Sequence, residues 1–203
     1  AAMDEGEVEE YHKNLLRSSK AQNYLRGRCI SRDVMEIYNL GFDPADEVVL
    51  FPVYSRKGDV LFYKSRSLVG KHFFNAKDID KTAAVYGLYQ TLEAKIPDST
   101  EIWLVESEID ALSLVSKGIL AWAFMGSDIS EKQIKEMCQS PYRRFVIATD
   151  NDEAGRKAAR RIKDKLIPLG FRFFNLKWLT DLKDVNELIQ NYGDDFEDYL
   201  HRY

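Results

Sequence analysis

The amino-acid sequence predicts an α/β fold in which a parallel β-sheet flanked by helices follows a small α+β N-terminal subdomain. From residue 101 onward, strand-type and helix-type segments alternate, which is the pattern of a parallel sheet with right-handed crossovers. Before that point, a β-hairpin signal stands among helical segments. The 203 residues are 45 % hydrophobic and 31 % charged, which suffices for a buried core. We expect a subdomain over 1–95 and a second domain over 96–203.

The first half contains helix signals and one hairpin signal. Residues 4–10 contain five acidic side chains, which suit the positive end of a helix dipole. They predict a helix that continues to about residue 26. Ser31 is a suitable N-cap for a short helix over 32–38, which Gly41 ends. β-Branched and aromatic residues at 48–54 and 59–65 flank a turn sequence and predict a hairpin.

The second half predicts four strands and four helices in alternation. Gly118 and Gly170 each follow a predicted helix end, where a left-handed residue commonly stops a helix. The expected strands cover 101–106, 119–125, 145–150 and 171–177, and the expected helices cover 108–117, 130–138, 153–167 and 184–200. This order predicts a parallel sheet whose strand ends share one edge.

Composition excludes several classes of function. The net charge of −4 provides no general basic field for nucleic acid, so such binding would need local patches. No apolar run approaches the roughly 18 residues of a membrane span, and the N-terminus lacks a signal-peptide pattern. We therefore expect a cytoplasmic protein without a membrane partner. The chain has two cysteines, Cys29 and Cys138, and three histidines, His12, His72 and His201. Their spacing shows no zinc-ribbon, disulfide or nucleophile–base arrangement.

Carboxylates end two of the expected strands. Glu106 ends the strand over 101–106, and Asp150 and Asp152 end the strand over 145–150. The carboxyl ends of parallel strands meet at one edge, so these acids predict a site for a divalent metal that prefers oxygen ligands. Asp110 follows Glu106 by four residues on the same helix face and is expected to orient the site from outside the metal ligands. The alternative is that the acids cap helices, at about 0.3–1 kcal/mol each.

Two motifs resemble those of the Toprim domain found in primases, topoisomerases and some nucleases. The first is EGxxD, matched by Glu106-Ser-Glu-Ile-Asp110 with serine in place of the glycine, and the second is DxDxAG, matched by Asp150-Asn-Asp-Glu-Ala-Gly-Arg156. The second version is close to the primases of phage helicase-primases and of the bacterial DnaG type. Lys183-Asp-Val-Asn-Glu187 resembles the KDxNE segment of the phage group, which implies that Asp184 approaches the metals.

The resemblance continues upstream into the primase RNA-polymerase core. It rests on Tyr24–Arg28, on a Phe51-Pro-Val segment, and on Lys71-His-Phe-Phe-Asn75, which is one residue longer than the family's KYLN and shifts the alignment of Lys71 by one position. In that family the matching positions face template, nucleotide or nascent primer. The resemblance therefore implies nucleotide or nucleic-acid contacts for Arg28, Arg66, Lys71 and Asn75, together with Arg156 beside the acids.

The function implied by the resemblance is synthesis of short RNA primers on single-stranded DNA from ribonucleoside triphosphates. Glu106, Asp150 and Asp152 are the expected catalytic residues, and these three with Asp184 are expected to bind two Mg²⁺ or Mn²⁺ ions. The residues 96–203 would form the Toprim catalytic domain. A replicative helicase and a zinc-binding module, in cis or in trans, are the expected partners.

Two other functions stay open at this point. A Toprim nuclease would use the same metals to hydrolyse phosphodiesters. A non-catalytic nucleic-acid-binding module beside a helicase would need no metal, and clustered, mutually repelling acids argue against it.

Overall fold

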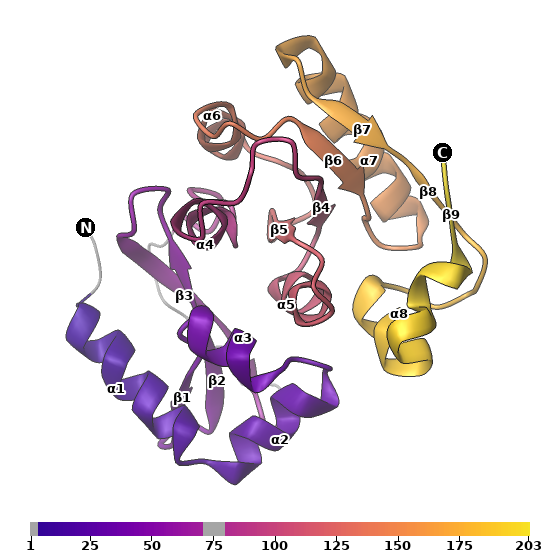
Figure 1. Cartoon of the computed structure of the whole chain (residues 1–203). Helices are drawn as coiled ribbons and strands as arrows, with labels where there is room; N and C mark the ends of the chain where they lie inside the picture. Colours follow the sequence, from indigo (N-terminus) through magenta and orange to yellow (C-terminus); the bar gives the residue numbers. More distant parts are fainter. Residues whose placement is uncertain (1–3, 71–79) are drawn as a thin grey trace.

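The first half of the chain folds around a three-stranded antiparallel sheet. The computed structural model describes residues 4–70 and 80–203 (Figure 1). The sheet has the order β1-β2-β3, with β1 at Gly41–Asp43, β2 at Val48–Tyr54 and β3 at Val60–Ser67. The predicted hairpin is confirmed, since β2 and β3 pair antiparallel. The helices of this half are α1 (Glu5–Leu16), which packs on β1, α2 (Ser19–Gly27) and α3 (Arg32–Ile37).

The single helix expected up to residue 26 is wrong, because the chain forms two helices there. Helix α1 ends at Leu16, and Ser18 starts α2 by accepting a hydrogen bond from the Ala21 N–H at 3.1 Å. This side-chain cap satisfies a free backbone donor and allows the change of direction. Strand β1 and helix α4 (Leu88–Glu93) were not predicted.

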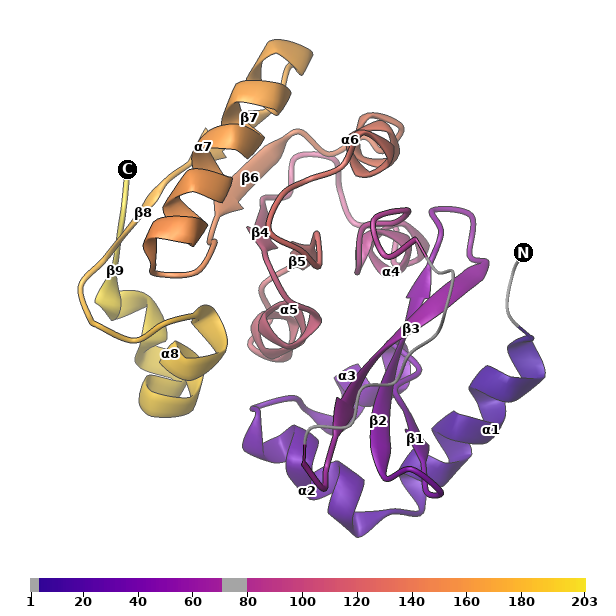
Figure 2. The same ribbon diagram turned by 180° about the vertical axis from the view of Figure 1, so that it is seen from behind.

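The second half contains the predicted parallel sheet, in the order β5-β4-β6-β7. Its strands are β4 (Ile102–Val105), β5 (Ala121–Ala123), β6 (Arg144–Ile147) and β7 (Arg172–Phe174), and its helices include α5 (Glu108–Ser116), α6 (Glu131–Cys138), α7 (Glu153–Leu166) and α8 (Val185–Tyr192). Because successive strand residues point to opposite faces, Leu104 and Phe145 pack with residues of α6 and α7, whereas Val105 and Val146 pack with α5 and α8. Figure 2 shows α8 beside α5, from the side opposite to Figure 1.

The C-terminal elements differ from the prediction in two places. The strand expected over 171–177 divides at Asn175 into β7 and β8 (Leu176–Trp178), which belong to different sheets. The helix expected over 184–200 ends at Tyr192, where Gly193 takes a positive φ of 56°. A 3₁₀ helix over Gly193–Tyr199 and strand β9 (Leu200–Arg202) follow, and β9 pairs with β8.

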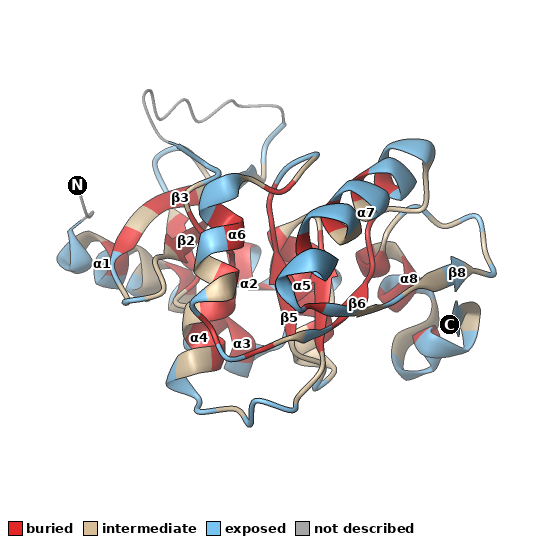
Figure 3. Cartoon of the chain, turned by 90° about the horizontal axis from the view of Figure 1, so that it is seen from above, coloured by how far each residue is buried: buried red, intermediate tan, exposed pale blue. Residues whose placement is uncertain are grey.

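One hydrophobic cluster joins the two halves. It contains Phe51 and Phe62 of the first sheet together with Leu112 of α5 and Leu188 of α8. Figure 3 shows buried residues running through both sheets and exposed residues along the outer surface of α7. The division at residues 95 and 96 stays a prediction. Within the described residues, no helix is long and apolar enough to cross a membrane.

Candidate metal centre

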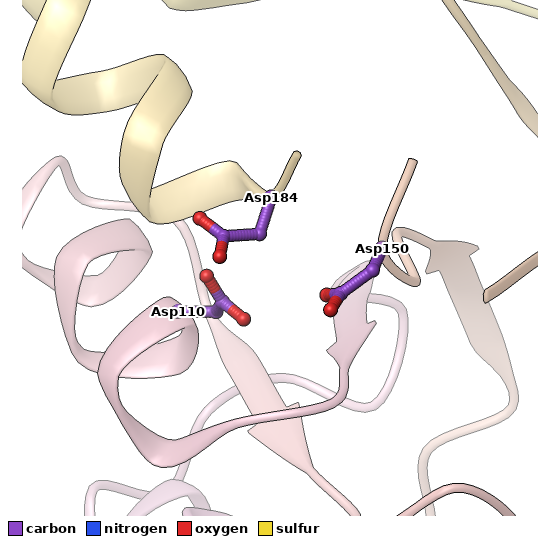
Figure 4. Close-up of side chains that lie close together, drawn as sticks. All are labelled: Asp110, Asp150 and Asp184. Atoms are coloured by element: carbon purple, nitrogen blue, oxygen red, sulfur yellow. The ribbon is translucent and has the colours of Figure 1, made fainter. Parts of the chain in front are cut away.

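Three carboxylates from separate segments meet where the parallel strands end (Figure 4). Asp110 lies in the first turn of α5, Asp150 follows β6, and Asp184 is the N-cap of α8. One oxygen from each lies within 4.8 Å of the other two. Ligands on opposite sides of a Mg²⁺ ion are about 4.2 Å apart, given bonds of about 2.1 Å. The 4.8 Å limit is slightly wider than this, so small side-chain movements would bring the three oxygens around one divalent ion. Carboxylate oxygens suit a hard cation.

Burial is the largest cause that raises the pKa of each of the three acids. Burial, then the hydrogen-bonded Glu106 and the nearby carboxylates, raises the pKa of Asp150 to about 8. Burial and the charge of Asp184 raise the pKa of Asp110 to about 7. Burial also raises the pKa of Asp184, although the Arg28 charge lowers it. A bound cation would offset this repulsion, since an opposite charge favours the ionised form.

Glu106 lies beside this group of three. Its Oε2 accepts a hydrogen bond from the backbone N–H of Asp150 at 2.6 Å, which joins the ends of β4 and β6. Its carboxyl group also raises the pKa of Asp150 through a side-chain hydrogen bond. Glu106 is thus next to the cluster, and its predicted metal and catalytic roles stay predictions.

Asp152 caps a helix. Its Oδ1 accepts from the Gly155 N–H at 2.7 Å and so begins α7. Asp184 caps α8 in the same way, with its Oδ1 accepting from the Glu187 N–H at 2.8 Å, yet it also belongs to the acidic group. The helix-capping alternative is therefore realised at both positions. The roles of Asp152 and Asp184 as metal ligands stay predictions.

Asp110 lies among the possible ligand atoms, whereas it was expected to orient them from outside. Its Oδ2 accepts from the Ser107 hydroxyl at 2.9 Å, and its Oδ1 accepts from the Asn186 N–H at 2.9 Å. Ser107, which replaces the glycine of the motif, also caps α5 through the Asp110 N–H at 3.2 Å. The serine thus holds Asp110 by two hydrogen bonds that a glycine lacks.

The loop after β6 brings Asp184 to the site. The Asn151 side-chain amide donates to the carbonyls of Thr180 at 3.0 Å and Leu182 at 2.9 Å. The Asn151 backbone N–H donates to the Lys183 carbonyl at 2.6 Å. The place of Asn151 inside the DxD motif is the sequence signal for this role.

Gly155 allows the same loop to close. A Cβ at this position would lie 1.9 Å from the carbonyl oxygen of Asp150. That separation is far shorter than any real contact, so the backbone of α7 approaches Asp150 closely only because residue 155 has no side chain.

Two arginines of the first half lie close to the acidic segment. A guanidinium nitrogen of Arg66 lies 3.5 Å from Oε1 of Glu108, which is 1 % exposed. That oxygen has no hydrogen-bond partner, so the contact is an ion pair only. The Arg28 guanidinium donates to Asn186 Oδ1 at 3.4 Å, and Asn186 donates to the Arg28 carbonyl at 2.8 Å. Sequence reasoning missed Glu108 and Asn186, although both stand inside the recognised motifs.

The remaining predicted contacts are not members of the group of three acids. Arg156 is exposed on α7 and pairs with Glu153 at 3.4 Å. Lys71 and Asn75 lie outside the described residues.

Comparison with known proteins defines the class. Residues 103–189 match the family described as Toprim-like. The four-stranded parallel sheet with its helices is accordingly a Toprim fold.

Similarity extends over nearly the whole chain. A DNA primase of Pseudomonas aeruginosa is 25 % identical, with 92 % of this chain and 35 % of the primase aligned. An uncharacterized protein of Mycoplasma genitalium is 28 % identical over 88 % of this chain and 85 % of its own length. This chain thus spans about a third of the Pseudomonas primase.

Solved primase structures share the fold. The zinc-binding and RNA polymerase domains of the Aquifex aeolicus primase align with a TM-score of 0.81 and 21 % identity, over 97 % of this chain and 59 % of that one. The primase fragment of the bacteriophage T7 primase-helicase aligns with a TM-score of 0.59 and 20 % identity, over 85 % of this chain and 71 % of that one. Of these two, the bacterial structure is the more similar.

Proposed function

We propose that this protein is a primase-type RNA-polymerase core, which joins ribonucleotides into short primers on a single-stranded DNA template. The observation that carries the proposal is the meeting of Asp110, Asp150 and Asp184 within 4.8 Å, with Arg28 and Arg66 supplied by the other half of the chain. Acids that hold a cation, next to arginines that bind phosphate, are what phosphoryl transfer from a nucleoside triphosphate requires. Similarity to DNA primases supports the same reaction.

The acidic residues would bind Mg²⁺ or Mn²⁺. We assign a first ion to the three clustered aspartates, and a second ion to Glu106, which contacts Asp150, together with Asp152. Bound there, the ions would neutralise the triphosphate and the charge that develops on the transferred phosphorus. Glu106 keeps its Oε2 on the Asp150 N–H, which leaves its other oxygen to bind an ion or to accept the proton of the primer 3′-hydroxyl.

The arginines would hold the nucleic acid and the nucleotide. The planar guanidinium binds phosphate through two parallel hydrogen bonds. Arg66 is oriented by the buried Glu108, and Arg28 is oriented by Asn186, whose backbone also holds Asp110. We propose that these two contact template or triphosphate, with Lys71, Asn75 and Arg156 as further contacts.

Partners would complete the activity. Zinc-binding domains and a helicase accompany the primase core in the Aquifex and T7 proteins named above. We propose that a replicative helicase and a zinc-binding module act with this core, in cis or in trans.

A primer-synthesis assay tests the proposal. The protein is incubated with Mg²⁺, labelled ribonucleotides and single-stranded DNA, and products are separated by size. Oligoribonucleotides should form with the unaltered chain and with Lys157→Gln, a change on the exposed surface of α7. Loss of at least about 100-fold is expected for Asp150→Asn and Asp184→Asn, because each removes a metal-binding charge. Full activity in both variants would contradict the proposal.

Two other outcomes identify the alternatives. Metal-dependent cleavage of labelled nucleic acid without nucleotides would indicate a Toprim nuclease. Tight binding of single-stranded DNA that is insensitive to EDTA, with neither synthesis nor cleavage, would indicate a non-catalytic module.

A further inference from the structure

A pocket lies between α7 and strand β8, beside the acidic cluster. Its volume is about 360 Å³, within the usual range for small-molecule sites. One side is the surface of α7 that carries Arg156, Arg160 and Lys163, and the other is β8 with Trp178. Thr149 and Asp150 also line it, so it lies next to the acidic cluster. Figure 2 shows α7 running beside the segment that contains β8.

The lining of this pocket is strongly basic. Four cations face it, namely Arg156, Arg160, Lys163 and Lys177, against Asp150 as its one carboxylate. On a helix, residues three and four positions apart lie on one face, so the three cations of α7 line one wall. Glu153 pairs with Arg156 and Arg160 from outside, but it is 63 % exposed. Such exposed pairs contribute little and exchange readily for a stronger anion.

Lys163 lacks a carboxylate partner. Its ammonium group donates to Asn175 Oδ1, and among the ion pairs of the described residues none includes it. Burial lowers its pKa; the charge of the adjacent Asp164 opposes this shift, and the charge of Arg160 adds to it. A half-buried ammonium in this position is stabilised by an anion, since opposite charge offsets the loss of hydration.

Two aromatic residues line the same pocket. Trp178 is half-buried and Tyr203 is 65 % exposed, and both line it. The other two tryptophans, Trp103 and Trp122, are buried in the core. A flat ring next to cations is the combination that binds nucleotides, because bases stack on aromatic faces while phosphates pair with the charges.

We propose that this pocket binds a nucleotide, with its phosphates on Arg160 and Lys163 and its base against Trp178. The ligand is either a free nucleoside triphosphate or the terminal nucleotide of a strand, since the chemistry is the same. This site is additional to the acidic cluster and needs no metal. Its existence does not depend on primer synthesis.

Tryptophan fluorescence of the full chain provides the test. Trp178 is the one half-exposed tryptophan, so a ligand stacked on it should quench emission in a saturable manner. The titrations use ATP, inorganic triphosphate and an oligoribonucleotide five residues long, all in EDTA to remove divalent metal from the acidic cluster. Lys163→Gln should weaken ATP binding about tenfold, because one charge-assisted hydrogen bond is lost. Lys157→Gln removes the same charge from a residue of α7 that does not line the pocket, and should leave affinity unchanged.

Further measurements distinguish the possible ligands of this pocket and exclude binding at the acidic cluster. Calorimetry with Trp178→Ala should show weaker ATP binding but unchanged inorganic triphosphate binding, because only the base contact is removed. Stronger competition by the oligoribonucleotide than by ATP assigns the pocket to a strand end, and the reverse assigns it to a free triphosphate. Thermal melting confirms that each variant is folded.

Unchanged ATP affinity in folded Lys163→Gln and Arg160→Gln would overturn the proposal. So would ATP binding that occurs only with Mg²⁺ and is lost in Asp184→Asn, since that ligand would belong to the acidic cluster. Failure of primer synthesis with intact ATP binding in EDTA would contradict the proposed function alone.

Discussion

The backbone N–H of Asp150 donates to Oε2 of Glu106 across 2.6 Å, although the two residues are separated by 44 positions in sequence. Neighbouring parallel strands β4 and β6 bring them together, and both strands end at this point. One oxygen of Glu106 therefore has a structural role in holding the strand ends. Any chemical role of this residue depends on its negative charge and its second oxygen.

Substitutions of Glu106 should separate these two roles. Glu106→Gln keeps a carbonyl oxygen for the Asp150 N–H but removes the charge, so stability should change by less than about 0.5 kcal/mol, the range of an ordinary polar change. Primer synthesis should fall at least about 100-fold, because the metal or proton acceptor is lost. Glu106→Ala should also lower the free energy of unfolding by about 1–3 kcal/mol, because a part-buried N–H loses its partner. Urea unfolding and the primer assay measure the two effects. Equal stability of the two variants would contradict the structural role.

A side chain at residue 155 should disrupt the acidic loop. In Gly155→Ala the new Cβ would lie 1.9 Å from the Asp150 carbonyl, so the loop or α7 must shift. We expect a loss of about 1–3 kcal/mol or more, as for overpacked sites, together with weaker Mg²⁺ binding. Gly27→Ala is the matched control, because a Cβ there meets nothing within 4 Å. Urea unfolding and calorimetric Mg²⁺ titration compare the two, and equal results would rule out the steric constraint.

The metal-free protein should lose stability as the pH rises. Asp110 and Asp150 have folded-state pKa values of about 7 and about 8, above the ordinary 3.8. Between pH 3.8 and about pH 8 the folded state binds more protons than the unfolded state, so the free energy of unfolding falls as the pH increases. Thermal melting in EDTA should show a falling Tm between pH 5 and pH 8, and Asp110→Asn should flatten this slope. Mg²⁺ should raise the Tm more at pH 8 than at pH 5, because it binds the ionised carboxylates. A Tm that rises over this interval in EDTA would contradict the repulsion.

The ion pair between Arg66 and Glu108 should appear in a double-mutant cycle. Arg66→Gln leaves the buried Glu108 carboxylate without its only nearby countercharge among the described contacts, and should cost about 1–2 kcal/mol. The additional change Glu108→Gln removes that charge and should restore part of the loss. Free energies of unfolding in urea for the single and double variants give the coupling. Additive effects would show that the two side chains act independently.

Much of the fold follows from patterns in the sequence, because alternating strands and helices after residue 101 leave few topologies. The hairpin over β2 and β3 was likewise visible from its turn residues. The break between α1 and α2 was missed although the local Ser18 cap marks it. The short β9 was missed because it depends on a tertiary contact that outweighs local preference. Strand β9 forms only because β8 offers it a partner.

The position of the site at the strand ends could be predicted from the sequence, but the set of residues that form the acidic cluster could not. Glu106, Asp150 and Asp184 follow from motifs, and the structure brings Asp150 and Asp184 together. Asp110 was assigned to an outer position because helical spacing alone does not say how far its side chain reaches. The hydrogen bonds from Ser107 and Asn186 decide that position, and the second of these crosses 76 residues of sequence.

The three hydrogen bonds from Asn151 to residues 180–183 also affect the order in which the parts of the site form during synthesis and folding. The acidic cluster takes its members from positions 110, 150 and 184, so two of them are synthesised long before the third. Contacts between such distant positions form late, because closing the intervening chain costs entropy. The ability to bind a divalent ion with three carboxylates would therefore arise only after residues 180–184 have docked on Asn151, so metal affinity would appear late in folding.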